Sequence, residues 1–218
     1  MQKTLEIAEE IPAIRPLSFF ALEHDIPYMP AAIGRKKFLK KPFLLPSSEI
    51  LTGEEDFADI AMGWNEEGIY LALEIRQPFE QSNFPAFSKG DALEVFLDTR
   101  GQKTRSITKF CHHFVFLPVE VNDIKALEIT KFRMEDSHEL ADPSVLLVET
   151  QFAAKSYCMS IHITRDALYG FDPNQSKNLG FTYILHRKEG KPQSFSCAPQ
   201  EYHVAKHPQL WASCKLLK

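Results

Sequence analysis

The alternation of apolar and polar positions is clearest in residues 91–98. One row of this stretch is Leu93, Val95 and Leu97, and the other is Glu94, Phe96 and Asp98. A period of two residues predicts a β-strand with one buried face. Two carboxylates and a phenylalanine are an unusual set for a solvated face. They favour a polar groove with an aromatic wall, although an exposed face that happens to be acidic is the simpler alternative.

The same alternation recurs along most of the chain. It predicts further strands at 58–64, 69–75, 111–117, 127–133, 145–152, 157–163, 179–185, 194–197 and 212–217. Pro118 is expected to end the strand at 111–117, and a capped helical turn is expected at 164–168. About ten short strands separated by turns, with almost no helix, are typical of an all-β, two-sheet antiparallel β-sandwich. We expect one core that contains Leu93, Val95, Leu97, Ile69, Leu71 and Leu73. Trp64 continues an apolar row and is expected in the core rather than in a ligand platform.

Residues 1–46 differ from the rest because prolines fall at 12, 16, 27, 30, 42 and 46. Prolines at this density exclude a long helix, but the apolar residues between them are too many for a disordered linker. We therefore expect a proline-rich N-terminal extension that packs on the sandwich of residues 47–218 as part of the same domain. The basic cluster 35–41 is expected to be a solvated strand end, with an anion-binding patch as the alternative.

Composition narrows the class of protein. The chain has 218 residues, of which 44% are hydrophobic, and a net charge of −4, which disfavours nucleic acid as a partner. Seventeen Phe against two Trp suggest a core built on phenylalanine. Because no apolar run reaches the length of a secretory signal or of a membrane helix, we expect a cytoplasmic protein with no membrane partner. Export by a specialised secretion system stays open.

The four cysteines, at 111, 158, 197 and 214, form no Cys-x-x-Cys pair. We expect all four to be reduced and at least three to be buried in strands. Strand alternation sends His112 and His113 to opposite faces, while Cys111 and His113 share one. No second Cys/His cluster is spaced to complete a zinc site, so no metal is expected; one histidine would be buried and the other would lie in the groove.

Motifs for catalysis are missing. The chain has no glycine-rich phosphate loop, no Gly-x-Ser-x-Gly and no His-Glu-x-x-His. Glu94 and Asp98 are four residues apart on one strand face, which places their Cα atoms about 13 Å apart. A glycosidase needs about 5–9.5 Å between its two carboxyl groups. We therefore expect a binding protein and not an enzyme, with a catalytic partner for one of these carboxylates on another strand as the open alternative.

Asp91–Asp98, which reads DALEVFLD, resembles the signature strand of family 9 carbohydrate-binding modules and of their DOMON-like relatives. Residues 61–75, 161–171, 179–183 and 207–212 resemble further strands of these modules in the same order, so that the resemblance covers roughly residues 40–218. The stretch FCHHFVFLP, residues 110–118, resembles an uncharacterised bacterial subgroup that contains this module.

The resemblance implies a jelly-roll-like sandwich that binds sugar or a glycan without a cofactor. It implies that Glu94 contacts the sugar and that Arg100 or Arg105 supplies the arginine of a neighbouring strand. Phe87 is the aromatic residue nearest to the Gly-Asp pair, one residue further away than in the modules, and Phe195 falls near the second aromatic of the sugar clamp. Asp98 and His112 complete the predicted site. Binding of another protein or of an anionic ligand on the same scaffold is the alternative; haem is disfavoured because no Met and His can be paired for it.

Overall fold

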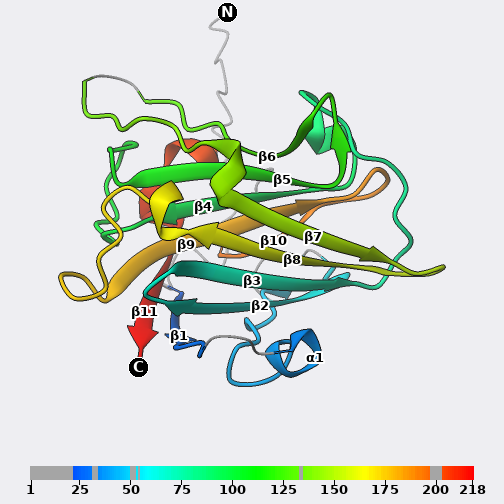
Figure 1. The fold of residues 1–218 in the computed structure, drawn as a ribbon, viewed down its shortest axis with the longest axis horizontal. Coiled ribbons are helices and arrows are strands. Elements are labelled where there is room, and N and C mark those ends of the chain that lie inside the picture. Colours follow the sequence, from blue (N-terminus) through cyan, green and yellow to red (C-terminus); the bar gives the residue numbers. More distant parts are fainter. Residues whose placement is uncertain (1–21, 31–33, 50–52, 54, 133–134, 197–202) are drawn as a thin grey trace, which may run out of the picture.

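The protein is a sandwich of two β-sheets (Figure 1). The computed structural model describes residues 22–30, 34–49, 53, 55–132, 135–196 and 203–218. In these residues the larger sheet has the order β1 (Glu23–Pro27), β11 (Ala212–Leu217), β9 (Asn178–His186), β4 (Ala92–Asp98), β5 (Cys111–Val121) and β6 (Ile124–Glu128), and β10 (Gln193–Ser194) pairs with β9. The smaller sheet has the order β2 (Ala58–Asn65), β3 (Gly68–Ile75), β8 (Tyr157–Thr164) and β7 (Leu146–Phe152).

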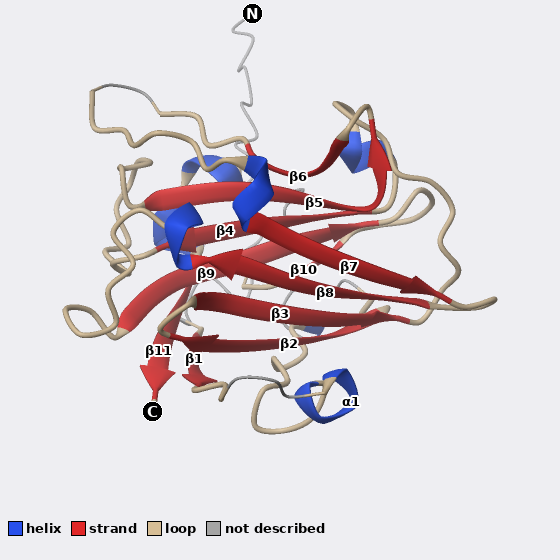
Figure 2. Ribbon diagram, in the orientation of Figure 1, coloured by secondary structure: helices blue, strands red, loops and turns tan. Residues whose placement is uncertain are grey.

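Helical segments in the described residues are short (Figure 2). They are α1 (Arg35–Phe38) and the 3₁₀ turns η2 (Phe87–Lys89), η3 (Pro143–Val145), η4 (Arg165–Ala167), η5 (Val204–Lys206) and η6 (Pro208–Leu210). The helical turn expected at 164–168 is therefore present as η4, but Thr164 makes no side-chain capping hydrogen bond there. None of these helices has the length and apolar character that crossing a membrane requires.

The core between the sheets contains the residues that alternation assigned to it. Leu93, Val95 and Leu97 from β4 meet Ile69, Leu71 and Leu73 from β3, and each of the six is at most 2% exposed. Trp64 belongs to the same core, and its Nε1 donates a hydrogen bond to the carbonyl oxygen of Leu217. The predicted fold class, an all-β antiparallel sandwich, is confirmed.

The second face of β4 is not solvated, which corrects the expectation of an open polar face. β4 is an inner strand between β9 and β5, and Phe96 and Asp98 are each only 1% exposed. Two apolar clusters cover the outer side of the sheet. One contains Ala92, Val115, Leu117, Phe84 and Phe87, and the other contains Phe96, Cys111, Ile184, Val204 and Trp211.

Three predicted strands differ clearly from the observed ones. The strand expected at 194–197 is observed as β10, Gln193–Ser194, and residue 197 lies outside the described residues. β5 continues through Pro118 to Val121, because the register shifts between Phe116 and Val121 and an irregular pairing tolerates a residue without an N–H. The next strand is β6, Ile124–Glu128, and not 127–133. Asn122 and Asp123, with φ values of 53° and 62°, make the tight turn of the β5–β6 hairpin.

The described part of the N-terminal segment packs on both sheets. β1 pairs in parallel with β11, and Ile26 is fully buried in the main core. Residues 35–38 of the basic cluster form α1 and not a strand end. Phe38, Met29 and Phe43 lie against Gly63, where a Cβ would come within 3.1–3.3 Å of each of them. A residue larger than glycine at position 63 would therefore push this segment away from β2.

Three cysteines lie in the described residues, and all three are free thiols. Cys111 and Cys214 are buried, whereas Cys158 is partly exposed. Cys197 lies outside the described residues, so the expectation that at least three cysteines are buried stays a prediction.

Candidate functional site

Glu94 lies at the centre of the larger sheet and is held by a histidine from each neighbouring strand. In the strand register Glu94 faces Val115 of β5 and Ile184 of β9, so the histidines two residues along each neighbour are its diagonal partners. His113 Nε2 donates a hydrogen bond to Glu94 Oε2, and His186 Nε2 donates to Oε1, each over 2.6 Å. Both carboxylate oxygens are therefore fixed in orientation.

The carboxyl group of Glu94 is ionised at neutral pH. Burial by itself would raise its pKa, but the hydrogen bonds from His113 and His186 outweigh that effect and lower the pKa to about 2. The side chains of Glu94, His113 and His186 are 10%, 15% and 12% exposed. Each of the three side chains keeps a small exposed surface, and we call these three residues the Glu94 site.

Aromatic rings flank the Glu94 site on both sides. The ring of Phe96 stacks on His113 with centroids 4.2 Å apart, and the ring of Phe87 is tilted against His186 at 6.3 Å. Phe87 is only partly buried. Of the two aromatic residues predicted for the site, Phe87 is the one that lies near it, because its ring contacts His186, a partner of Glu94.

The predicted charged partners of Glu94 lie elsewhere. Asp98 accepts hydrogen bonds from the backbone N–H groups of Arg100 (3.0 Å) and Gln102 (2.7 Å), and so fixes the turn after β4. The guanidinium of Arg100 contacts Gln175 Oε1 and the ring of Phe110. Arg105 is exposed in the loop that follows. Imidazoles, and not either arginine, hold the carboxylate of Glu94.

His112 and His113 point to opposite faces, as alternation requires. His113 is the histidine of the Glu94 site, whereas His112, which we had assigned to it, points to the inner side of the sheet. His186 is not among the predicted site residues, because only the strand order, with β9 beside β4, brings it to Glu94. The alternation of residues 178–186 shows on which face of its strand His186 lies, but not that this strand is the neighbour of β4.

Phe195 does not reach the Glu94 site. It follows β10, its N–H donates to the carbonyl of Tyr183 and its own carbonyl accepts a hydrogen bond from the hydroxyl of Thr182. This pairing turns the ring into the core between the sheets, where it stacks on Tyr183 and has no exposed surface. A fully buried ring cannot stack on a ligand from solvent, so the assignment of Phe195 to the site is not supported.

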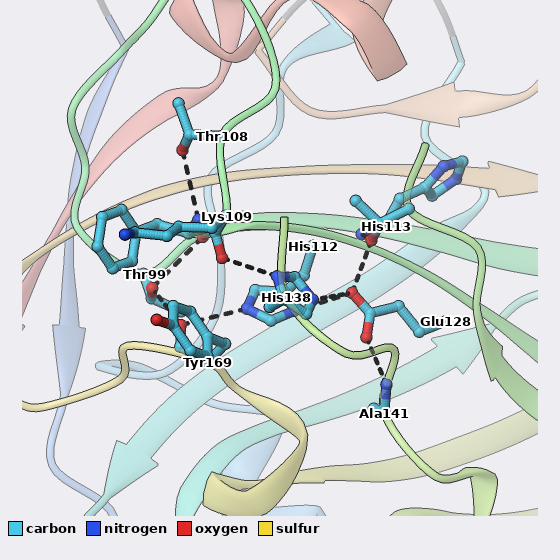
Figure 3. A network of polar contacts seen from close by, with 11 residues as sticks. Thr99, Thr108, Lys109, His112, His113, Glu128, His138, Ala141 and Tyr169 are labelled. Carbon is cyan, nitrogen blue, oxygen red and sulfur yellow. Dashed lines mark hydrogen bonds and ion pairs between the residues drawn. The ribbon is translucent and has the colours of Figure 1, made fainter. Parts of the chain in front are cut away.

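A second group of histidines surrounds Glu128 at the end of β6 (Figure 3). His112 Nδ1 and His138 Nε2 lie 3.0 and 2.9 Å from the same oxygen of Glu128, Oε1. Thr130 donates its hydroxyl to Oε1, and the N–H of Ala141 donates to Oε2. Burial would raise the pKa of Glu128, but the contacts with His112, His138 and Thr130 lower it to about 2. These three residues could hold a metal ion.

A separate hollow of about 240 Å³ lies on the outer face of the smaller sheet. Tyr70 stacks on His162 in its wall, with ring centroids 4.0 Å apart. Arg35, Phe38, Leu147 and Glu149 complete most of the lining. This hollow therefore combines an aromatic wall with charged groups.

The fold is similar to that of three solved structures. A family 9 carbohydrate-binding module from Caldicellulosiruptor kristjanssonii, solved in complex with glucose, is similar with a TM-score of 0.63 and 14% identity, over 89% of this chain and 95% of that one. The same kind of module in complex with cellotriose gives 0.60 and 14%, over 89% and 93%. A candidate carbohydrate-binding protein from Bacteroides uniformis gives 0.54 and 11%, over 91% and 100%. No family model and no curated protein matches the chain.

Proposed function

We propose that the protein is a non-catalytic module that binds carbohydrate at the Glu94 site. The observation that carries this proposal is the ionised carboxylate of Glu94, which is 10% exposed and is oriented at both oxygens by imidazoles, one of which lies against the ring of Phe87. The fold supports it, because structures of similar fold were solved with glucose and with cellotriose. We also propose that the sandwich has a jelly-roll topology and that the protein is cytoplasmic. The same proposal includes a relation to DOMON-like proteins and to the bacterial subgroup with the FCHHFVFLP stretch.

The chemistry of the Glu94 site suits sugar hydroxyls. A carboxylate offers about four lone-pair positions, of which the two histidines use two, so the remaining positions can accept hydrogen bonds from hydroxyl groups. The partly buried ring of Phe87 offers apolar surface to C–H groups. Because each polar side chain exposes only a small part of its surface, we expect one sugar ring or a chain end to enter, and not the middle of a long polymer.

The surroundings of Glu94 do not form a pair of catalytic carboxylates. Its hydrogen-bond partners are histidines, and the nearest acidic residue on the same strand face, Asp98, is tied to backbone N–H groups. Glycoside hydrolysis by the common mechanisms needs two carboxyl groups about 5–9.5 Å apart on either side of the bond. The proposal is therefore a binding function without catalysis.

The alternative function is binding of another protein or of an anionic ligand, and its site would be the hollow on the smaller sheet. A second hollow that shares Arg35 and Glu149 with it is also lined by Lys36 and Lys37, so the charges there are mixed and do not favour an anion. Leu147 and Phe152 of the edge strand β7 are half exposed, a feature that fits a protein partner.

The test is a calorimetric titration with glucose, cellobiose and cellotriose. We expect Glu94→Gln to weaken binding about 10- to 100-fold, the loss typical of one charge-assisted hydrogen bond. Phe87→Ala should also weaken binding. Glu149→Gln and Phe152→Ala, the matched changes on the smaller sheet, should leave affinity unchanged.

The same titration separates the two surfaces. If Glu149→Gln abolishes binding and Glu94→Gln does not, the sugar site is the hollow on the smaller sheet. If a broad sugar screen gives no binding to the wild-type protein, the carbohydrate proposal fails and the protein-partner alternative replaces it.

A further inference from the structure

His112, Glu128 and His138 come from three separate segments and converge under one loop (Figure 3). His112 lies on the inner face of β5, Glu128 ends β6, and His138 belongs to the loop between β6 and η3. Their side chains are 0%, 0% and 1% exposed. One ligand atom from each lies within 4.8 Å of the other two.

The hydrogen-bond partners of the two imidazoles are all acceptors. His138 Nδ1 lies 2.7 Å from the carbonyl oxygen of Lys109, and His112 Nε2 lies 3.4 Å from that of Tyr169. Their other ring nitrogens face Glu128 Oε1. A neutral imidazole has only one N–H, so four such contacts require both rings to be cationic. Two buried cations with ring centroids 4.3 Å apart would repel each other strongly.

We infer that the cluster is a binding site for a divalent transition-metal ion of the zinc class. His112 Nδ1, His138 Nε2 and Glu128 Oε1 are the ligands, and both rings are then neutral. The outer N–H groups of the rings donate to the carbonyls of Tyr169 and Lys109, which is the usual arrangement behind metal-bound histidines. Thr130 and Ala141 orient the carboxylate.

The ligand types decide the class of metal. Imidazole nitrogen with one carboxylate suits zinc and its neighbours, whereas calcium and magnesium prefer sites made of oxygen. Three protein ligands leave a position for water. The Glu94 site contains the same residue types but does not converge in this way, since its two histidines bind different oxygens of the carboxylate.

The consequence of this site is structural. A metal ion at this position would tie the loop that carries His138 to the ends of β5 and β6. Ala141, whose N–H contacts Glu128, also lines a hollow with Leu140 and Tyr169, so the loop bounds an open surface on its other side. Metal binding is therefore expected to order this end of the sandwich.

The first experiment uses the full-length chain after treatment with a chelator. Titration with Zn²⁺ should show about one tightly bound ion per chain by calorimetry, while Mg²⁺ should show none. Co²⁺ should give visible absorption bands that excess Zn²⁺ removes. Absence of Zn²⁺ binding, or equal binding of Mg²⁺, would overturn the inference.

The second experiment compares variants of the two clusters. His138→Ala should weaken Zn²⁺ binding by more than about 100-fold, because loss of even an outer partner of a ligand costs about 10- to 100-fold. Glu128→Gln should act in the same direction. Glu94→Gln and His186→Ala should keep Zn²⁺ affinity, so failure of the metal site and failure of the sugar site are distinguishable.

His138 lies in a loop, so His138→Ala removes no strand pairing. This variant therefore keeps the test valid if Glu128→Gln does not fold. Hydrogen exchange gives an independent readout. Zn²⁺ should slow exchange of the backbone amides of residues 135–142 in the wild-type protein and leave them unchanged in His138→Ala. Unchanged exchange in the wild-type protein, or Zn²⁺ affinity retained in His138→Ala, would show that these residues do not bind the ion.

Discussion

His112 and His113 are adjacent in the sequence and serve different carboxylates on opposite faces of β5. His113 contributes to a partly open site with Glu94, and His112 contributes to a closed cluster with Glu128. The difference in exposure follows from the position of each face. The inner face meets the second sheet, whereas the described residues that cover the outer face include loops and short turns. A single substitution can therefore disrupt one of the two clusters without changing a residue of the other.

Glu94 is expected to make the protein sensitive to acid. Its pKa is about 2 in the folded protein against 4.5 for the ordinary group, so between these values the unfolded chain binds more protons and stability falls as the pH falls. Ionised Glu94 therefore contributes about 3 kcal/mol to the free energy of unfolding. This contribution is fully present above pH 4.5 and is lost at about pH 2. Glu94→Gln resembles the protonated group. We therefore expect the wild-type protein to be more stable than the variant at pH 6, and the difference to shrink towards pH 2 in urea unfolding.

The groups that set this pKa are His113 from β5 and His186 from β9. Taking the difference between wild type and variant at each pH cancels the acid sensitivity of Glu128. A constant difference from pH 6 to pH 2 would show that the charge of Glu94 does not stabilise the fold. A large stability loss at neutral pH together with unchanged sugar affinity would assign Glu94 a structural role only.

The cysteines should differ in reactivity towards an alkylating reagent. Burial raises the pKa of the Cys214 thiol to about 12, and the group is almost never ionised at neutral pH. Cys158 is partly exposed on β8, and burial raises its pKa by a smaller amount. We expect iodoacetamide to modify Cys158 well before Cys214 in the native protein, as measured by peptide mass spectrometry. Equal rates in the native state would contradict the burial of Cys214.

At the scale of elements, Gln193 of β10 connects the two sheets. Its Oε1 accepts hydrogen bonds from the N–H groups of Phe57 and Ala58, and its Nε2 donates to the carbonyl of Ala58 and to the hydroxyl of Tyr183. The residue is 2% exposed, so these partners are shielded from bulk water in the folded protein. The amide thus fixes the start of β2 against β9.

Gln193→Ala should lower the free energy of unfolding by about 2–4 kcal/mol, because it leaves two N–H groups and a carbonyl without partners in the core. Urea denaturation measures this difference. Gln102→Ala, at an exposed position, is the control and should change stability by less than about 0.5 kcal/mol. A cost below about 1 kcal/mol for Gln193→Ala would mean that water or a shift of β2 compensates.

The sequence allows the strands to be predicted but not their neighbours. Alternation places Leu93, Val95 and Leu97 correctly in the core, because the period of two is a local property. The partners of Glu94 depend on β9 lying beside β4, which no local pattern encodes. The same limit explains why β1 and the Glu128 cluster were missed: each depends on contacts between segments far apart in the chain.

At the scale of the molecule, the two ends of the described chain meet on one edge of the larger sheet (Figure 1). β1 pairs with β11 from Glu23 to Pro27 and covers an edge that would otherwise be open. Ile26 adds a fully buried side chain to the main core. The strand therefore contributes both hydrogen bonds and apolar contacts to a sheet formed mostly by residues after 90.

Two truncations that differ only by this strand should differ in stability. Deleting residues 1–27 removes β1, whereas deleting residues 1–21 leaves it in place, so the comparison isolates the strand. We expect the larger deletion to lower the melting temperature by at least about 5 °C relative to the smaller, because losing a buried isoleucine alone costs about 2–5 kcal/mol. It should also promote self-association, since the uncovered edge of β11 can pair with another chain. Thermal denaturation and sedimentation velocity measure the two effects. Ile26→Ala in the full-length chain should reproduce the loss of stability without the self-association, because the backbone of β1 still covers the edge. Self-association of Ile26→Ala would mean that exposed apolar surface, and not the open strand edge, causes it.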